Sequence, residues 1–141
     1  MRVLMVHSDL TLVGGMQTYV GDLQTYLTTG GGVEVTELDE TKCKGYASIY
    51  RRPGILRLVA GSVRLLRELR RLLREAPPDL VHLHAAEGKS LLEKTWMARM
   101  CWRARVPAIL HLHGPGVDRE IGTGPKWRRE LFRRVWRRGV S

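Results

Sequence analysis

The amino-acid sequence predicts an α/β protein with a doubly wound parallel sheet, packed in three α/β/α layers. Two observations predict it. Apolar runs of four to six residues, bounded by Gly, Pro or Asp, alternate along the chain with stretches of helical period, as buried parallel strands alternate with helices. Three of these runs end in histidine, and together they contain every histidine of the protein: His7, His82, His84, His111 and His113. The 141 residues suit a single domain, residues 1–141.

The first half of the chain contains two predicted strands and one predicted helix. An apolar run predicts a strand over residues 2–8, and apolar side chains every three or four residues predict a helix over 16–28. The glycines at 30–32 end this helix, because glycine adopts the left-handed cap conformation without steric cost. Alternating polar and apolar residues predict a second strand over 33–38, and residues 46–50 are a weaker candidate for an edge strand.

The second half continues the alternation with three helices and two strands. Leucine and valine at three- and four-residue spacing predict a helix over 55–75, with arginine at many of the other positions. A pair of prolines ends it, and a strand follows over 79–84. We expect a broadly apolar helix over 90–104, a strand over 108–113 and a basic helix over 126–138.

The predicted strand order brings three histidines together. Right-handed crossovers in a doubly wound sheet place the first strand beside the strand that ends at His84, and the strand that ends at His113 comes next. Ligands of such sheets bind at the carboxyl ends of the strands. We therefore expect the functional site at the edge where His7, His84 and His113 lie.

Composition limits the partners and the compartment. The chain has 24 Lys and Arg against 14 Asp and Glu, a formal net charge of +10, which indicates either an anionic partner or a solvated arginine-rich surface. Cys43 and Cys101 have no metal-like or redox-like spacing, so we expect free thiols in a reducing, cytoplasmic compartment. The apolar run at the amino terminus is too short for a signal peptide, and no stretch reaches the ~20 apolar residues of a membrane span.

Two glycines separate the first strand from the first helix. At such a position Gly14 and Gly15 would let the backbone approach a phosphate at the helix N-terminus. The pair has neither the G-x-G-x-x-G spacing of dinucleotide sites nor the Lys-Ser/Thr of a P-loop. The alternative is a turn that needs a positive φ.

The two His-x-His pairs suggest a metal site, which we weighed and did not expect. Residues two apart on a strand share a face, so four imidazoles could approach one another. However, no Cys or carboxylate has a matching position, and helices should cover this face and leave the inner pair packed and hydrogen-bonded. We therefore expect His82 and His111 in the core, His84 and His113 facing a ligand, and His7 in between.

Carboxylates follow two of the strand ends. Glu87 comes shortly after the strand that ends at His84, and Asp118 and Glu120 lie in the loop after His113. Each could act as an acid or a base, although loop carboxylates are commonly only solvated. No Ser-His-Asp or Cys-His arrangement stands out, so hydrolase chemistry is not expected.

The last helix is basic and amphipathic. Its apolar face consists of Trp127, Leu131, Val135 and Trp136, and arginines cover much of the rest, among them Arg128, Arg129, Arg133 and Arg134. Such a helix suits an anionic membrane interface. Equally, the same apolar face could pack on the sheet and leave the arginines in water.

Five segments in order resemble a known domain. They are Met1-Arg-Val-Leu-Met-Val-His7, Gly14-Gly15-Met-Gln-Thr-Tyr-Val20, Val33-Glu-Val-Thr-Glu-Leu38, Pro78-Asp-Leu-Val-His-Leu-His84 and Val106-Pro-Ala-Ile-Leu-His-Leu-His-Gly114. The chain resembles the amino-terminal, acceptor-side domain of the retaining GT-B glycosyltransferases of family 4, over nearly its whole length. The resemblance implies one Rossmann-like half of a two-domain enzyme that transfers a sugar from a nucleotide-sugar donor to a glycan or lipid-linked acceptor.

The resemblance also implies roles for individual residues. The backbone of Gly14 and Gly15 would approach the donor diphosphate, and His113 would touch the transferred sugar as the catalytic residue. We expect the rest of the cleft wall to be His7, His84, Glu87 and Gly114. Most members need no metal, so we expect none and no other cofactor. Many members act at membranes. We therefore expect Trp127, Trp136 and the arginines of the last helix to contact the inner membrane face peripherally.

The family's donor-binding carboxy-terminal half has no counterpart in this sequence. We therefore expect a truncated or split enzyme that is inactive alone and needs a donor-binding domain or subunit. The alternative is a non-catalytic membrane- or partner-binding module with the same fold. Nucleic acid is not an expected partner, because only the charge favours it.

Overall fold

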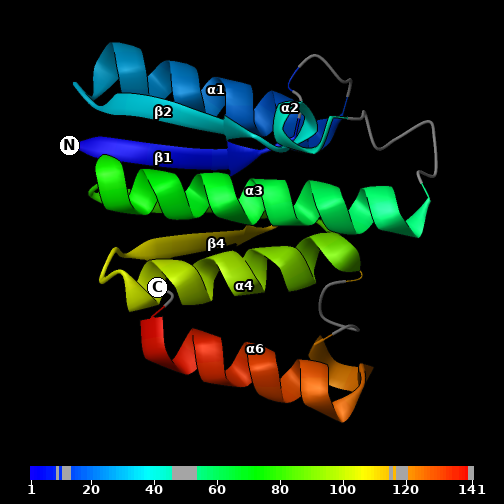
Figure 1. The fold of residues 1–141 in the computed structure, drawn as a ribbon. Coiled ribbons are helices and arrows are strands. Elements are labelled where there is room, and N and C mark those ends of the chain that lie inside the picture. The colour runs from blue at the N-terminus through cyan, green and yellow to red at the C-terminus, as the bar shows by residue number, and fades with distance from the viewer. Residues whose placement is uncertain (9, 11–13, 46–53, 115, 117–120, 140–141) are drawn as a thin grey trace.

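The computed structural model describes residues 1–8, 10, 14–45, 54–114, 116 and 121–139, and for 136–139 it describes the backbone alone. Within these residues a four-stranded sheet has the order β2-β1-β3-β4 (Figure 1). The strands are β1 (Arg2–His7), β2 (Glu34–Asp39), β3 (Leu80–Ala85) and β4 (Ala108–Leu112). Every neighbouring pair is parallel, which confirms the predicted doubly wound α/β fold and the predicted neighbours of the first strand.

All the helices except α2 lie close to their predicted positions. They are α1 (Gly15–Gly30), α2 (Glu40–Lys44), α3 (Ile55–Glu75), α4 (Lys89–Arg103) and α6 (Lys126–Gly139). The long apolar stripes were sufficient to place α1, α3, α4 and α6. The weaker edge strand predicted at 46–50 lies outside the described residues.

Helix α2 was not predicted. It has only five residues, and its two caps define it. The Asp39 carboxylate accepts hydrogen bonds from the backbone amides of Thr41 and Lys42, and Gly45 ends the helix with a φ of 70°. A helix this short is specified by its ends and has no periodic apolar stripe to detect.

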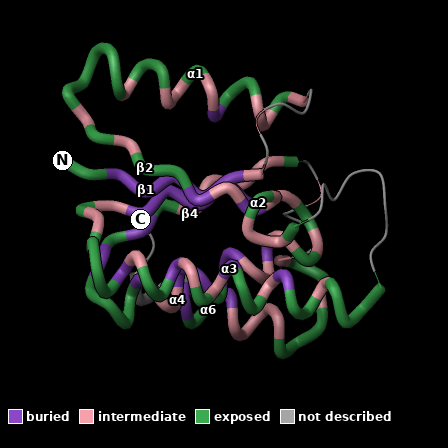
Figure 2. The backbone as a smooth tube through the Cα atoms, turned by 45° about the horizontal axis from the view of Figure 1, so that its top comes forward, coloured by how far each residue is buried: buried purple, intermediate pink, exposed green. Residues whose placement is uncertain are grey.

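The strand β1 is buried on both of its faces, as a central parallel strand should be. On one face Val3 and Met5 pack with Val20 of α1. On the other face Leu4 and Val6 join the larger core cluster, to which α3 and α4 contribute Leu65, Leu69, Met97 and Ala98. Figure 2 shows α1 on one side of the sheet and α3, α4 and α6 on the opposite side.

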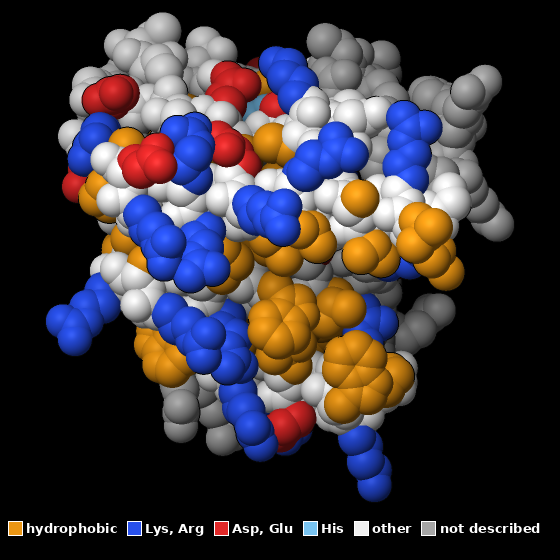
Figure 3. Space-filling model, in the orientation of Figure 1, with side chains coloured by type: hydrophobic (Ala, Val, Ile, Leu, Met, Phe, Trp, Pro, Cys, Tyr) orange, Lys and Arg blue, Asp and Glu red, His pale blue; other side chains and the backbone are white. Residues whose placement is uncertain are grey.

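Apolar side chains are exposed where α3 and α4 meet. Leu56 is 85% exposed and Ile55 75%, and Val59, Val63 and Trp96 are also exposed. Residues of both helices line a groove of about 340 Å³ between them. Figure 3 shows these side chains as a hydrophobic area with Lys and Arg side chains around it.

Candidate functional site

The histidines of the chain gather on the face of the sheet that α1 covers. His82 pairs in register with Met5, and His84 with His111, so alternate side chains of β1, β3 and β4 point to the same side. The ring centroids of His82 and His84 are 4.2 Å apart, those of His84 and His111 5.5 Å, and those of His111 and His113 4.3 Å. Tyr19 of α1 lies against this group, with its ring centroid 4.6 Å from that of His111. The predicted convergence of the histidine-bearing strands is therefore confirmed.

The burial of His84 and His111 differs from the prediction, whereas His82 is buried as predicted. His84 is only 1% exposed and His82 8%, whereas His111 is half-buried. We had expected His84 to face a ligand and His111 to lie in the core. The reason is the position of each strand: β3 has a neighbour on both sides, whereas β4 has only one among the described residues. Sequence periodicity predicts which face a residue occupies, but it does not tell a central strand from an outer one.

His84 and His113 contact each other directly. The Nδ1 of His84 lies 3.0 Å from the Nε2 of His113, so one ring donates a hydrogen bond to the other. The half-buried His113 follows β4, and its backbone N–H donates to the carbonyl of Ala85 at 2.8 Å. Both the backbone and the ring of His113 are thus held against the end of β3.

The pKa values of these imidazoles are lowered. Burial, and then the neighbouring His111 and His113, lower the pKa of His82 to about 4. Burial and the surrounding histidines lower the pKa of His84 to about 2, and burial and His111 also lower the pKa of His113. At neutral pH these rings are uncharged, so each presents one N–H donor and one lone pair.

His7 lies at the end of β1 and is 2% exposed. Its Nδ1 lies 2.7 Å from the carbonyl oxygen of Ser8, and its Nε2 lies 3.6 Å from a carboxylate oxygen of Glu37. The ring is therefore held at the carboxyl edge of the sheet, where we expected it.

Glu87 and Gly114 lie next to each other at the same edge. The Glu87 Oε1 accepts a hydrogen bond from the backbone N–H of Gly116 at 2.7 Å. Gly114 has a φ of 117°, and a Cβ added there would lie 3.0 Å from the same oxygen. The glycine after His113 is therefore required by the backbone, and Glu87 fixes the loop that follows it. Asp118 and Glu120 lie outside the described residues.

Gly14 and Gly15 lie where α1 begins, at the carboxyl end of β1. Gly14 has an extended backbone with a φ of 176°, so the alternative of a positive-φ turn is wrong. A Cβ on Gly15 would meet no described atom within 4 Å. The first turn of α1 has no acidic residue and no side-chain cap. The Nε2 of Gln17 donates to the Oγ of Ser8 at 3.4 Å, which joins the helix start to the strand end.

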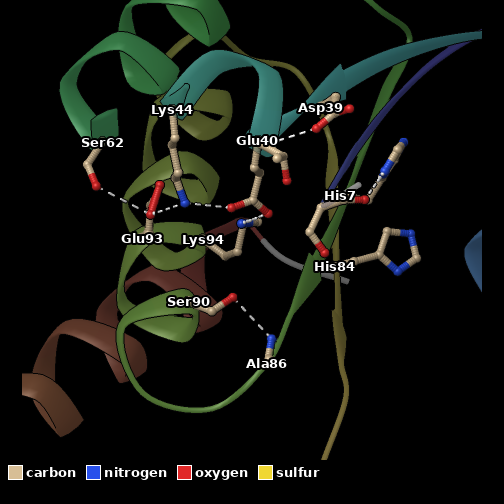
Figure 4. A network of polar contacts seen from close by, with 12 residues as sticks. His7, Asp39, Glu40, Lys44, Ser62, His84, Ala86, Ser90, Glu93 and Lys94 are labelled. Carbon is tan, nitrogen blue, oxygen red and sulfur yellow. Dashed lines mark hydrogen bonds and ion pairs between the residues drawn. The ribbon is translucent and has the colours of Figure 1, made fainter. Parts of the chain in front are cut away.

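A buried ionic network, which the sequence analysis did not predict, lies on the opposite side of the strands. Lys94 of α4 is fully buried and forms an ion pair with Glu40 of α2. Lys44 bridges Glu40 at 2.7 Å and Glu93 at 2.9 Å (Figure 4). Burial alone would raise the pKa of Glu40, but Lys94 and Lys44 outweigh it and lower this pKa to about 2. One signal was present in the sequence: Lys94 lies on the same helical stripe as Leu91, Ala98 and Cys101.

The last helix, α6, packs on the rest of the domain with its apolar face. Phe132 is 1% exposed, Val135 is buried and Leu131 packs beside them, so the packed alternative is confirmed for Leu131 and Val135. Trp127 is 60% exposed, and the side chain of Trp136 lies outside the described residues. Phe132 was not counted, although it is three residues before Val135 and four before Trp136, so helical spacing could have placed it on the same face.

The four arginines singled out on α6 have partners within the chain. Arg128 donates to the carbonyl of Gly88 at 2.9 Å, and Arg129 to that of Gly122 at 3.1 Å. Arg133 and Arg134 form ion pairs with Glu130 at 3.1 and 2.8 Å. Exposed ion pairs of this kind are weak, because water and salt screen them, so these arginines could bind an anionic surface instead.

The sequence matches a known family. A family model described as "Glycosyl transferase 4-like domain" matches residues 14–141. Comparisons with curated proteins and with solved structures gave no significant match. Among the described residues, no helix is both long and apolar enough to cross a membrane.

Proposed function

This chain belongs to the glycosyl transferase 4-like domain family, and we propose that it forms the acceptor-side half of a retaining transferase. The enzyme would move a sugar from a nucleotide-sugar donor to a glycan or lipid-linked acceptor. One structural observation supports this proposal in addition to the family membership. His113 is fixed against His84 at the edge of the sheet where the start of α1 also lies, with Tyr19 of α1 in contact with both rings.

The start of α1 is proposed to hold the donor diphosphate. Free backbone amides at a helix N-terminus donate to anions, and the positive end of the helix dipole adds to the attraction. An acidic residue or a capping side chain would compete with the phosphate, and the first turn of α1 has neither. The space next to Gly15 leaves room for a close approach of the diphosphate.

His113 is proposed to contact the transferred sugar. Its lowered pKa keeps the ring neutral, so it acts as a hydrogen-bond donor to a sugar hydroxyl and not as a cation. When His84 Nδ1–H donates to His113 Nε2, the proton of His113 is on Nδ1 and free to donate. His84 is then a positioning residue, and His7, Glu87 and Gly114 form the rest of the wall. We expect no metal or other cofactor to take part in the transfer step.

The proposal includes a donor-binding half outside the present sequence. Backbone amides at one helix end offset only part of a diphosphate's charge, and we propose that cations of a second domain complete this site. That half is either a continuation of this polypeptide or a separate subunit. This chain alone would then turn over a nucleotide sugar poorly or not at all.

A transfer assay with UDP- and GDP-sugars tests the proposal. We expect turnover only when the donor-binding half is supplied, and a decrease in kcat of about 10²- to 10³-fold for His113→Asn. Ile109→Ala is the matched control, because Ile109 is exposed on the same face of the same strand. The proposal fails if no donor-binding half restores transfer, or if both variants have the activity of the unmodified protein.

One observation favours the second candidate, a non-catalytic module that binds an anionic membrane. The exposed apolar residues of α3 and α4 have basic neighbours, among them the exposed Arg57, Arg64 and Lys89. Apolar insertion combined with cations is the pattern of a helix lying at a lipid interface. Such contact would also suit a transferase with a lipid-linked acceptor, at the inner face of the cytoplasmic membrane.

Co-sedimentation with liposomes tests the membrane contact. We expect the chain to pellet with anionic but not with neutral liposomes, and to be released at high salt. Leu56→Asp should weaken pelleting, whereas Trp127→Ala on α6 should weaken it only if α6 is the helix that contacts lipid. Equal pelleting with both kinds of liposome would contradict the membrane interpretation. Membrane binding without transfer in the presence of a donor-binding half would favour the module over the enzyme.

A further inference from the structure

We propose that His82, His84 and His111 form a binding site for a divalent cation of the zinc class. Each of the three offers one ring nitrogen, and these nitrogens all lie within 4.8 Å of one another. The site is distinct from the donor site proposed at Gly14 and Gly15, and it is not needed for the transfer step. It therefore goes beyond the proposed function and can be tested without any sugar.

The sheet itself brings the three side chains together. His82 and His84 are two residues apart on β3, and His84 pairs in register with His111 on β4. Because both strands are held by a ladder of hydrogen bonds, the three Cα positions are set by the fold and not by a loop. A site on rigid strands loses little conformational freedom when a cation binds.

Two ring nitrogens of these histidines are buried without a partner among the described residues. In the part of the chain that the structure describes, the Nε2 of His82 and the Nε2 of His84 have no hydrogen-bond partner and almost no exposure. Leaving a buried polar group unsatisfied costs about 1–3 kcal/mol. The prediction that the inner histidines are hydrogen-bonded is therefore wrong for the Nε2 of His82, and among the described residues the Nε2 of His84 also has no partner. A cation would satisfy both lone pairs.

The surroundings of His84 suit a metal ligand. A ligating imidazole must be neutral, and it commonly donates its other N–H to a neighbouring acceptor. His84 has such a neighbour, because its Nδ1 lies 3.0 Å from the Nε2 of His113.

The ligand type and number define the class of cation. Imidazole is a good ligand for Zn²⁺, Co²⁺, Ni²⁺ and Cu²⁺, whereas Mg²⁺ and Ca²⁺ need oxygen ligands, and this group consists of histidine alone. Tetrahedral ligands at about 2.1 Å from zinc lie about 3.4 Å from one another. The three nitrogens, which lie within 4.8 Å of one another, would have to move closer through rotation of the rings to reach this spacing. Three protein ligands leave the fourth position to water.

Titration with Co²⁺ and Zn²⁺ tests the proposal on the chelator-treated chain, produced without a polyhistidine tag. We expect one equivalent of Co²⁺ to give the intense visible spectrum of four-coordinate cobalt, and Zn²⁺ to displace it. The His111→Ala variant should bind at least tenfold more weakly, and Ile109→Ala on the same face should bind like the unmodified chain. Cys43→Ser should also bind normally, which excludes thiol ligation at the half-buried Cys43.

A second measurement needs no variant. The ring ¹⁵N resonances of His82, His84 and His111 should shift together on addition of one equivalent of Zn²⁺, whereas Mg²⁺ should leave them unchanged. The proposal is overturned if these three resonances do not move at one equivalent. It is also overturned if His111→Ala, shown to be folded by circular dichroism, binds Co²⁺ as tightly as Ile109→Ala.

Discussion

His84 and His113, which are 29 residues apart in the sequence, join the ends of two neighbouring strands through ring nitrogens 3.0 Å apart. In a pair of neutral imidazoles only one ring can donate this hydrogen bond, so the tautomer of one sets the tautomer of the other. A ligand that changes the proton position on buried His84 therefore changes what the more exposed His113 offers at the edge of the sheet.

The backbone at Gly114 should not accept a side chain. We expect Gly114→Ala to lower the free energy of unfolding by about 1–3 kcal/mol, because alanine rarely adopts a φ of 117°. Urea unfolding followed by circular dichroism measures this change. Gly122→Ala is the control, because a Cβ there meets no described atom within 4 Å and its φ lies outside the left-handed region. This variant should be neutral or slightly stabilising. Equal effects of both variants would contradict the explanation.

The ion pair of Glu40 and Lys94 should behave as a coupled pair. We expect Glu40→Gln to cost about 3–5 kcal/mol, because it leaves the buried Lys94 without a charged partner. Lys94→Met should cost less, because Glu40 keeps its ion pair with Lys44. The double variant should cost clearly less than the sum of the two, since Lys44 and Glu93 still pair. Additive costs in the double-mutant cycle would show that the pair is not coupled.

Stability should fall in acid because of Glu40. Its pKa is about 2 in the folded chain, against an ordinary value of 4.5, so the folded state keeps the charged form after the unfolded state has taken up a proton. The contribution is fully present above pH 4.5 and is lost as the pH falls toward 2, with about 2 kcal/mol already lost at pH 3. Urea unfolding of the chain and of Glu40→Gln at pH 6 and pH 3 measures it. The variant should lose less between these values, and an equal loss would contradict the prediction.

The two aromatic residues of α6 should differ sharply in their effect on stability. Phe132→Ala removes a buried ring and should lower the free energy of unfolding by about 3–5 kcal/mol. Trp127→Ala removes a largely exposed ring and should stay within about 0.5 kcal/mol. Thermal or urea unfolding compares them. A large cost for Trp127→Ala would mean that α6 packs with a different face.

Local patterns were sufficient for the long elements of the fold. Helix α3 was predicted at its observed ends, because leucines at three- and four-residue spacing and the following prolines define it without help from the rest of the chain. The strand order followed from the general handedness of parallel crossovers. Helix α2 was missed because only its caps specify it.

The positions of the candidate histidines along the sheet were predicted, but their burial was not. The strand ends placed His7, His84 and His113 at one edge correctly, yet the burial of His84 and His111 was exchanged because it depends on which strands flank each residue. The partnership of Lys94 and Glu40 joins residues 54 positions apart, and no spacing rule connects them. Contacts of this kind follow from tertiary packing, which a single sequence does not display.

The central claim is that the start of α1 and the end of β4 form one wall of a nucleotide-sugar site. The most direct measurement is a ¹H–¹⁵N correlation spectrum of the chain during titration with UDP-glucose and with GDP-mannose. The account predicts weak, saturable shifts at the backbone amides of Gly14, Gly15, His113 and Gly114 with at least one donor, and unchanged amides along α3. Shifts confined to other surfaces, or none at these four amides with either donor, would contradict it.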